Sequence, residues 1–171
     1  MTHSALKHLD YHNWANQRVL THLKSLPEEL FTREIKSVFQ TVSEVVTHMC
    51  VADALWLKII SGAAYEEAKE TGMRLKEGLK RKKIDDFISI FNDTALQYEA
   101  FFENLEDPDG EITIAHPILG EIKTPISEIL HHVVNHGTYH RGNISAMLRQ
   151  MGEAGVPTDY IYYLLSLKQT T

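Results

Sequence analysis

A run of apolar residues at helical spacing, from Ile126 to Met151, limits the folds open to this chain more than any other segment. Positions three and four residues apart lie on one side of an α-helix, which turns by about 100° per residue. His140 falls inside the arc of these apolar residues, and His136 falls about 20° outside its edge. Two imidazoles four residues apart can hold one metal ion, because such side chains are neighbours on a helix surface. Two ligands bind weakly, so we expect a third elsewhere in the chain. The apolar positions of the run are Ile126, Ile129, Val133, Gly137, Ile144, Met147 and Met151.

Three more segments show the same helical periodicity: Ser4 to Leu26, Thr41 to Ser61 and Ile84 to Leu105. The second begins with Thr41-Val42-Ser43-Glu44, the pattern of a capping box. Four amphipathic helices of about 20 residues are typical of a four-helix bundle. The sequence therefore predicts an all-α fold, in one domain over residues 1–171.

Two long connections separate these helices and allow a crossover topology. Residues 63–83 are polar, contain two glycines and are expected to form a long connection. Before the last helix, Glu111–Ile114 and Gly120–Thr124 are short and roughly alternating, which fits a small β-hairpin or two extended segments. Thr124 is then expected to cap the last helix, with Pro125 at its first position.

Composition excludes several classes of function. A formal net charge of -6 and a pI near 5.9 argue against nucleic acid as a partner, since phosphate binding needs a basic face. No apolar segment approaches the length of a membrane span, and the N-terminus lacks the apolar core of a signal peptide, so we expect a cytoplasmic protein.

The only cysteine, Cys50, points away from the apolar side of its helix and is expected to be a packed or partly exposed thiol, not a nucleophile.

His48 is the natural third ligand. It lies about 20° from the edge of the apolar stripe of its helix, as His136 does in the last helix. Three neutral imidazoles suit zinc, nickel or another divalent ion and leave positions open for water or substrate. His8 and His12 also form an i, i+4 pair, but they lie at the polar edge of the first helix's leucine stripe and are the weaker candidates. The alternative for all these residues is a hydrogen-bonded histidine of the core.

The first helix carries a second stripe, Tyr11, Trp14 and Arg18, on the side opposite its leucines. A helix apolar on one side and aromatic on the other is expected to contact both its own bundle and a loop or second subunit. The tail from Thr158, rich in tyrosine and leucine, is expected to pack back on the bundle or to join an interface.

Three of these segments resemble one known family. The segment from His136 to Ile144 is similar to the signature of the DinB family, whose pattern is H-x-x-x-H-R-G-Q-I. The segment from Tyr11 to Arg18 resembles the first helix of that family. His48, followed by Asp53 and Trp56, matches the segment that carries the family's first histidine. The resemblance thus covers three of the four helices in order.

This resemblance implies a four-helix bundle, often dimeric, with a divalent metal ion, commonly nickel or zinc, on three histidines. The matching positions are His48, His136 and His140. Some relatives are thiol S-transferases that use bacillithiol or mycothiol, and many members have no established activity. Asn143 departs from the signature, which has glutamine there. The shorter side chain puts in doubt a hydrogen bond made by that glutamine, but the departure leaves the three ligand positions unchanged.

The resemblance and the residues leave three functions open, and no catalytic residue is assigned. The first is transfer of a small-molecule thiol to an electrophile, with Tyr139, Arg141 and Asn143 as orienting groups, although helical geometry turns Arg141 away from the ligands and favours a structural ion pair. The second is metal-dependent hydrolysis, for which Asp53 would be the base despite projecting about 140° away from His48. The third is a non-enzymatic, stress-responsive metal-binding or dimeric interaction module.

Overall fold

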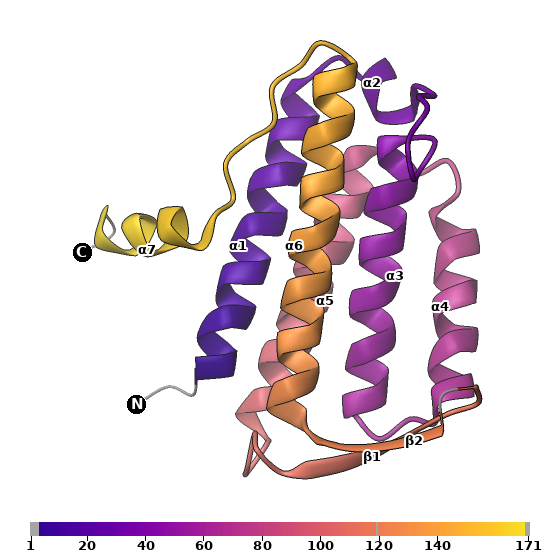
Figure 1. Cartoon of the computed structure of the whole chain (residues 1–171), viewed down its shortest axis with the longest axis vertical. Coiled ribbons are helices and arrows are strands. Elements are labelled where there is room, and N and C mark those ends of the chain that lie inside the picture. Colours follow the sequence, from indigo (N-terminus) through magenta and orange to yellow (C-terminus); the bar gives the residue numbers. More distant parts are fainter. Residues whose placement is uncertain (1–3, 119, 170–171) are drawn as a thin grey trace.

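Four long helices stand side by side and form the core of the molecule (Figure 1). They are α1 (Ser4–Ser25), α3 (Val42–Ile60), α5 (Ile84–Glu103) and α6 (Ile126–Gln150) in a computed structural model that describes residues 4–118 and 120–169. The predicted all-α bundle is confirmed. Thr41 caps α3 as predicted: its side chain accepts the backbone N–H of Glu44, and the Glu44 carboxylate accepts that of Thr41.

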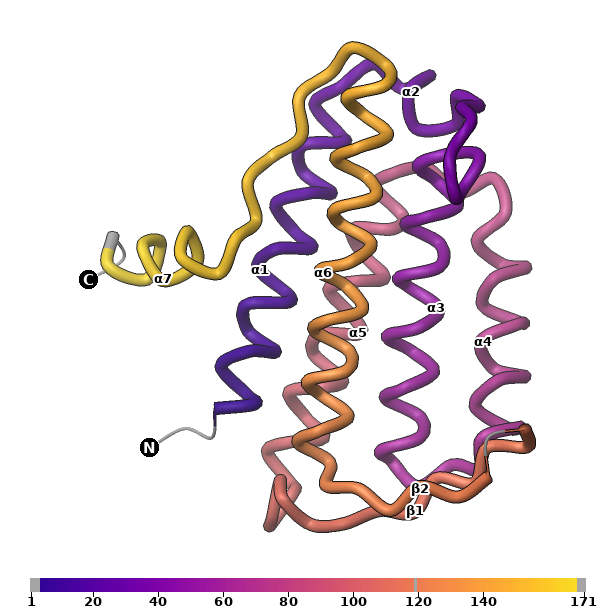
Figure 2. The backbone as a smooth tube through the Cα atoms, in the orientation of Figure 1, coloured from indigo at the N-terminus to yellow at the C-terminus, as the bar shows by residue number. Residues whose placement is uncertain are grey.

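The four helices occupy the corners of a square in which α1 and α3 each neighbour both α5 and α6. The backbone trace shows that α1 and α6 run in one direction while α3 and α5 run in the other (Figure 2). A parallel pair needs a connection that returns along the whole length of the bundle. The predicted crossover topology is therefore present, between α3 and α5.

The connection predicted over residues 63–83 forms this crossover, but most of it is a helix, α4 (Tyr65–Leu79), which the sequence did not predict. The buried side of α4 is made of small residues, Ala68 and Gly72, with Leu79 at its end, so the segment looks polar in composition. A Cβ atom at Gly72 would lie 3.1 Å from Cγ1 of Val51 on α3. The glycine lets the two helices approach closely, and this contact stabilises a helix that sequence periodicity does not predict.

The predicted hairpin before the last helix is confirmed. Strands β1 (Glu111–His116) and β2 (Gly120–Pro125) pair antiparallel with Ile114 opposite Ile122, and they cross the end of the bundle below α3 and α4 (Figure 1). The hairpin leads the chain from α5 to α6.

The predicted cap of α6 is wrong. Thr124 and Pro125 belong to β2, the helix begins at Ile126, and no side chain caps it. Instead the turn before β1 accepts the first free N–H groups: Ile126 donates to the carbonyl of Gly110, and Ser127 donates to that of Pro108. A contact distant in sequence thus replaces the local cap, and a local pattern cannot reveal it.

The tail forms a last helix, α7 (Tyr160–Gln169), which extends away from the bundle beside α1 (Figure 1). Tyr163 is buried against the rings of Tyr11 and Trp14, and the Tyr11 hydroxyl donates to the carbonyl of Thr158 at 2.8 Å. The aromatic side of α1 therefore contacts the chain's own tail, one of the two expected arrangements.

The apolar core is divided into two main clusters along the bundle. One contains Val19 and Ile144, and the other contains Leu9 and Leu130. Along α1, α3 and α6, buried polar side chains lie between the residues of the two clusters, so the middle of the bundle is a polar layer.

Within residues 4–118 and 120–169, no helix is both long enough and apolar enough to cross a membrane.

Candidate metal centre

Three histidines meet between α3 and α6. His48 of α3 places its Nε2 3.0 Å from Nε2 of His136, and His140 places its own Nε2 3.1 Å from the same atom. One ring nitrogen from each residue lies within 4.8 Å of the others. His48 is exposed, His136 is half-buried and His140 is buried, so the cluster opens to solvent on the His48 side.

Hydrogen bonding alone does not explain this arrangement. A ring nitrogen of a neutral imidazole either donates one hydrogen or accepts one, in the plane of the ring. Nε2 of His136 therefore cannot form two well-aligned hydrogen bonds to other ring nitrogens at once. A cation between the three lone pairs would satisfy all of them. The donor set and its spacing fit a divalent ion that prefers imidazole, such as zinc or nickel.

The protonation state of the cluster also suits a metal site. Burial, followed by the proximity of the other histidines, lowers the pKa of His136 to about 4, and burial and His48 lower the pKa of His140 to about 4. The pKa of His48 is lowered by burial and by the nearby Lys76 ammonium. At neutral pH the three rings are therefore uncharged and keep the lone pairs that a metal ion needs.

Neighbouring side chains hold the rings in place. Phe39, from the loop before α3, packs against His48 and His140 with ring centroids 5.5 and 5.6 Å away. The Asn143 amide nitrogen lies 3.3 Å from Nδ1 of His140. If this amide turned over, its oxygen would accept the Nδ1 hydrogen and leave Nε2 free for a metal ion. Asn143 is thus in contact with a proposed ligand, as expected of an orienting group; Phe39 was not foreseen, because its loop has no periodic pattern.

A cleft of about 570 Å³ opens beside His48. Its walls come from α3, from the loop that carries Phe39 and from the C-terminal end of α4 with the connection that follows. Lys76, Lys80 and Arg81 line it, and Lys80 is paired with Glu77 at 2.7 Å. The cleft could therefore admit a small molecule to the histidine cluster, and its basic lining favours an anionic one.

Behind the cluster lies a buried polar network that the sequence did not reveal. His12, predicted at the polar edge of α1, is 2% exposed, and its Nε2 lies 2.9 Å from Oδ2 of Asp53. Its Nδ1 lies 3.4 Å from Nη1 of Arg141, which also donates to Asn16 at 2.7 Å. His12 is therefore no partner of His8 in a metal site, and it links a buried carboxylate to a buried guanidinium.

Two expectations about individual residues change as a result. Arg141 points away from the histidine cluster, as expected, but its hydrogen bonds go to Asn16 and to the Thr138 hydroxyl rather than into a direct ion pair. Asp53 is 4% exposed and engaged by His12, so it is not placed to serve as a base at an open site. Cys50 is buried as predicted, and burial raises its pKa to about 12, which makes the thiol inert.

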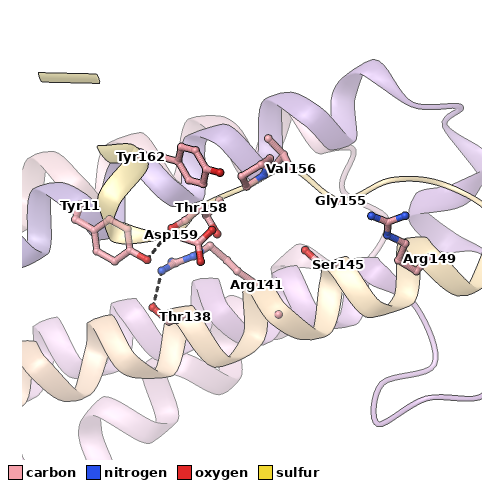
Figure 3. Close-up of a pocket in the computed structure, with 12 residues that line it drawn as sticks. Tyr11, Thr138, Arg141, Ser145, Arg149, Gly155, Val156, Thr158, Asp159 and Tyr162 are labelled. Atoms are coloured by element: carbon pink, nitrogen blue, oxygen red, sulfur yellow. Dashed lines mark hydrogen bonds between the residues drawn. The ribbon is translucent and has the colours of Figure 1, made fainter. Parts of the chain in front are cut away.

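A second groove, of about 490 Å³, lies on the Arg141 side of α6 (Figure 3). Arg141, Ser145 and Arg149 of α6 face residues 155–159 and Tyr162 across it, with Tyr11 of α1 at one end. The Arg141 guanidinium is almost wholly buried, so little of its charge reaches the groove. The cleft beside His48 is the better candidate for a substrate site.

Together, the fold and the site define a helical-bundle protein with a cluster of three histidines between two of its helices. The DinB family profile matches residues 1–170, and the chain is 42% identical over 168 residues to Protein DinB of Bacillus subtilis (strain 168), covering 98% of each. The chain belongs to the DinB family. Its fold also matches the crystal structure of a DinB-like protein from Bacillus cereus ATCC 10987, with a TM-score of 0.64 and 19% identity over 90% of this chain and 94% of the other.

Proposed function

We propose that this protein is a metal-dependent enzyme that transfers a low-molecular-weight thiol to an electrophile. His48, His136 and His140 would hold one divalent ion, nickel or zinc. The observation that supports the site is the double contact of His136 Nε2, which a shared cation relieves and hydrogen bonding does not. Family membership is consistent with such an ion.

A bound divalent ion would lower the pKa of a thiol and so supply a thiolate at neutral pH. The chain's own residues do the rest. The cleft beside His48 would orient the thiol, with Lys76 and Arg81 near its anionic groups. Phe39 covers the rings of His48 and His140 and would exclude water from that side. Because Cys50 is buried and inert, the thiol must come from solution.

Hydrolysis is the less favoured alternative. It needs a base beside the open position, and Asp53, the acidic residue considered for that role, is buried and bound to His12. Glu44 lines the cleft, but its carboxylate accepts the backbone N–H groups of Gln40 and Thr41. Asp53 is therefore not placed to take a proton from water, and Oε2 of Glu44 is already engaged by the backbone.

We further propose that the protein is a homodimer joined through α7. Ile161, Tyr162 and Leu165 are 58%, 47% and 47% exposed on a helix that already leaves the bundle. Exposure of such an apolar face to water is unfavourable, and its burial against a second apolar surface is favourable. If no enzymatic activity is found, this surface would serve a non-enzymatic interaction module.

The enzymatic proposal can be tested with a chlorobimane electrophile and a panel of small thiols, using protein loaded with zinc or nickel. In the expected reaction the thiolate sulfur attacks the CH₂ carbon and forms a C–S bond. The C–Cl bond breaks, chloride leaves with the electron pair, and the thiol proton goes to solvent. We expect His140→Ala to reduce the rate to background and Asn143→Ala to reduce it by about 10–100-fold. His22→Ala, outside the cluster, should change nothing. A rate that survives both metal removal and His140→Ala would refute the proposal.

A further inference from the structure

The loop that joins α2 (Glu29–Thr32) to α3 lies at the end of the bundle where α3 begins (Figure 1). Its residues 33–40 contain no helix or strand, and among them only Ile35 and Phe39 are partly buried. Val38, next to Phe39, is 78% exposed. Few buried apolar contacts are typical of a segment that opens locally while the rest of the fold stays intact. Two side chains therefore hold this segment, the Phe39 loop, on the bundle.

The ring of Phe39 separates the cleft beside His48 from the deeper part of the three-histidine cluster. His48 and Phe39 both line that cleft, whereas His136 and His140 do not. The same ring meets His140 edge-on, with centroids 5.6 Å apart, and His140 is only 5% exposed. A molecule or ion in the cleft therefore reaches His48 directly and reaches His140 only when Phe39 moves.

Hydrogen bonds give the loop a hinge at its junction with α3. The N–H of Ile35 donates to the carbonyl of Gln40 at 2.9 Å, so the residues between them form one closed unit. Oε2 of Glu44, an exposed residue, accepts the N–H groups of Gln40 and Thr41 at 2.8 and 3.3 Å and ties this unit to the first turn of α3. A rotation about this junction lifts Phe39 without breaking the bond that closes the loop.

We propose that the Phe39 loop is a lid over the candidate metal centre, and that its opening exposes His140 and controls how fast the metal ion enters and leaves. This inference rests on the proposed metal site and adds the step that governs access to it. In the closed position the apolar ring keeps water from two of the imidazoles. Loops that close over a site commonly limit how fast ligands exchange with solvent.

The first readout needs no metal. Diethyl pyrocarbonate acylates neutral imidazoles that solvent reaches, and mass spectrometry of peptides gives the rate at His140. Phe39→Ala should raise that rate about tenfold or more, because burial of the ring no longer opposes opening. Glu44→Ala, which frees the hinge and keeps the ring, should also raise it, and Glu44→Gln, whose amide oxygen still accepts, should raise it less. Val38→Ala should leave it unchanged.

His12 provides the control for folding. It is 2% exposed in the interior of the bundle and should stay unmodified in every variant. The second readout is the release of zinc from loaded protein to a chromogenic chelator. Phe39→Ala and Glu44→Ala should both accelerate this release, and Val38→Ala should not.

The outcomes separate the lid from the metal centre. A modification rate at His140 that stays unchanged in Phe39→Ala would overturn the lid. A rise in Phe39→Ala without one in Glu44→Ala would also overturn it, because the ring would then be a fixed shield. Zinc that is released at one rate from all variants would overturn the lid and leave the centre intact. A wild type that binds no zinc, with faster modification of His140 in both variants, would refute the centre and support the lid.

Discussion

At the scale of residues, the buried network behind the cluster decides how α6 faces α3. Asp53, His12 and Arg141 are each less than 5% exposed, and a buried charge is tolerated only when it is paired and hydrogen-bonded. The imidazole of His12 links the two charges across three helices. Because Arg141 follows His140 directly, fixing one side chain also fixes the direction of the other.

Gly137 makes room for this network, and Gly137→Ala should destabilise the protein by about 1–3 kcal/mol through overpacking. A Cβ atom there would lie 2.4 Å from Cε1 of His12 and 2.9 Å from Nη1 of Arg141. Gly142→Ala, on the same helix, would place its Cβ in open space and should stabilise by about 0.5–1 kcal/mol. Urea unfolding of the two variants measures both. Equal effects in the two would contradict the packing described here.

The metal-free protein should lose stability as the pH falls from about 6.5 to about 4. The pKa values of His136 and His140 are about 4 in the folded chain, whereas an unfolded histidine titrates near 6.5. Between these values the unfolded chain binds more protons, so the free energy of unfolding rises with pH. Urea unfolding across this window measures the slope. The double variant His136→Gln, His140→Gln should show a shallower slope, and an unchanged slope would show that these rings are not the cause.

At the scale of elements, sequence periodicity predicted the helices with broad apolar stripes and missed α4. Its buried positions are mostly alanine and glycine, which carry little hydrophobic signal, and it is stabilised by close contact with α3. The start of α6 was misplaced for a related reason. The groups that cap it, the carbonyls of Pro108 and Gly110, belong to the turn before β1, so the whole hairpin separates them from α6 in the sequence.

For α7, exchange of a single residue tests the proposed dimer. Leu165→Glu places a charge on the exposed apolar face and should convert a dimer into a monomer in sedimentation-velocity experiments. Ile122→Glu introduces the same charge at another exposed apolar residue, on β2, and should leave the dimer intact. A dimer that persists in Leu165→Glu, or a monomeric wild type, would exclude α7 as the interface.

At the scale of the whole molecule, the bundle and the convergence of three histidines could be predicted because His48 and His136 lie at the border of an apolar stripe and His140 lies within one. A side chain there points between two helices, so His48 and His136 meet where their helices pack. The network of His12, Asp53 and Arg141 could not be predicted in this way. Its members look like surface residues on isolated helices, and only the pairing of three helices brings their polar groups into contact.

The metal content of the purified protein, measured by mass spectrometry, shows whether the three histidines bind one metal ion. The protein should be purified without a histidine tag and without added metal. We expect near-stoichiometric nickel or zinc in the wild type and in His22→Ala, and its loss in both His48→Ala and His140→Ala. A metal-free wild type, whose melting temperature does not change when zinc or nickel is added, would contradict it.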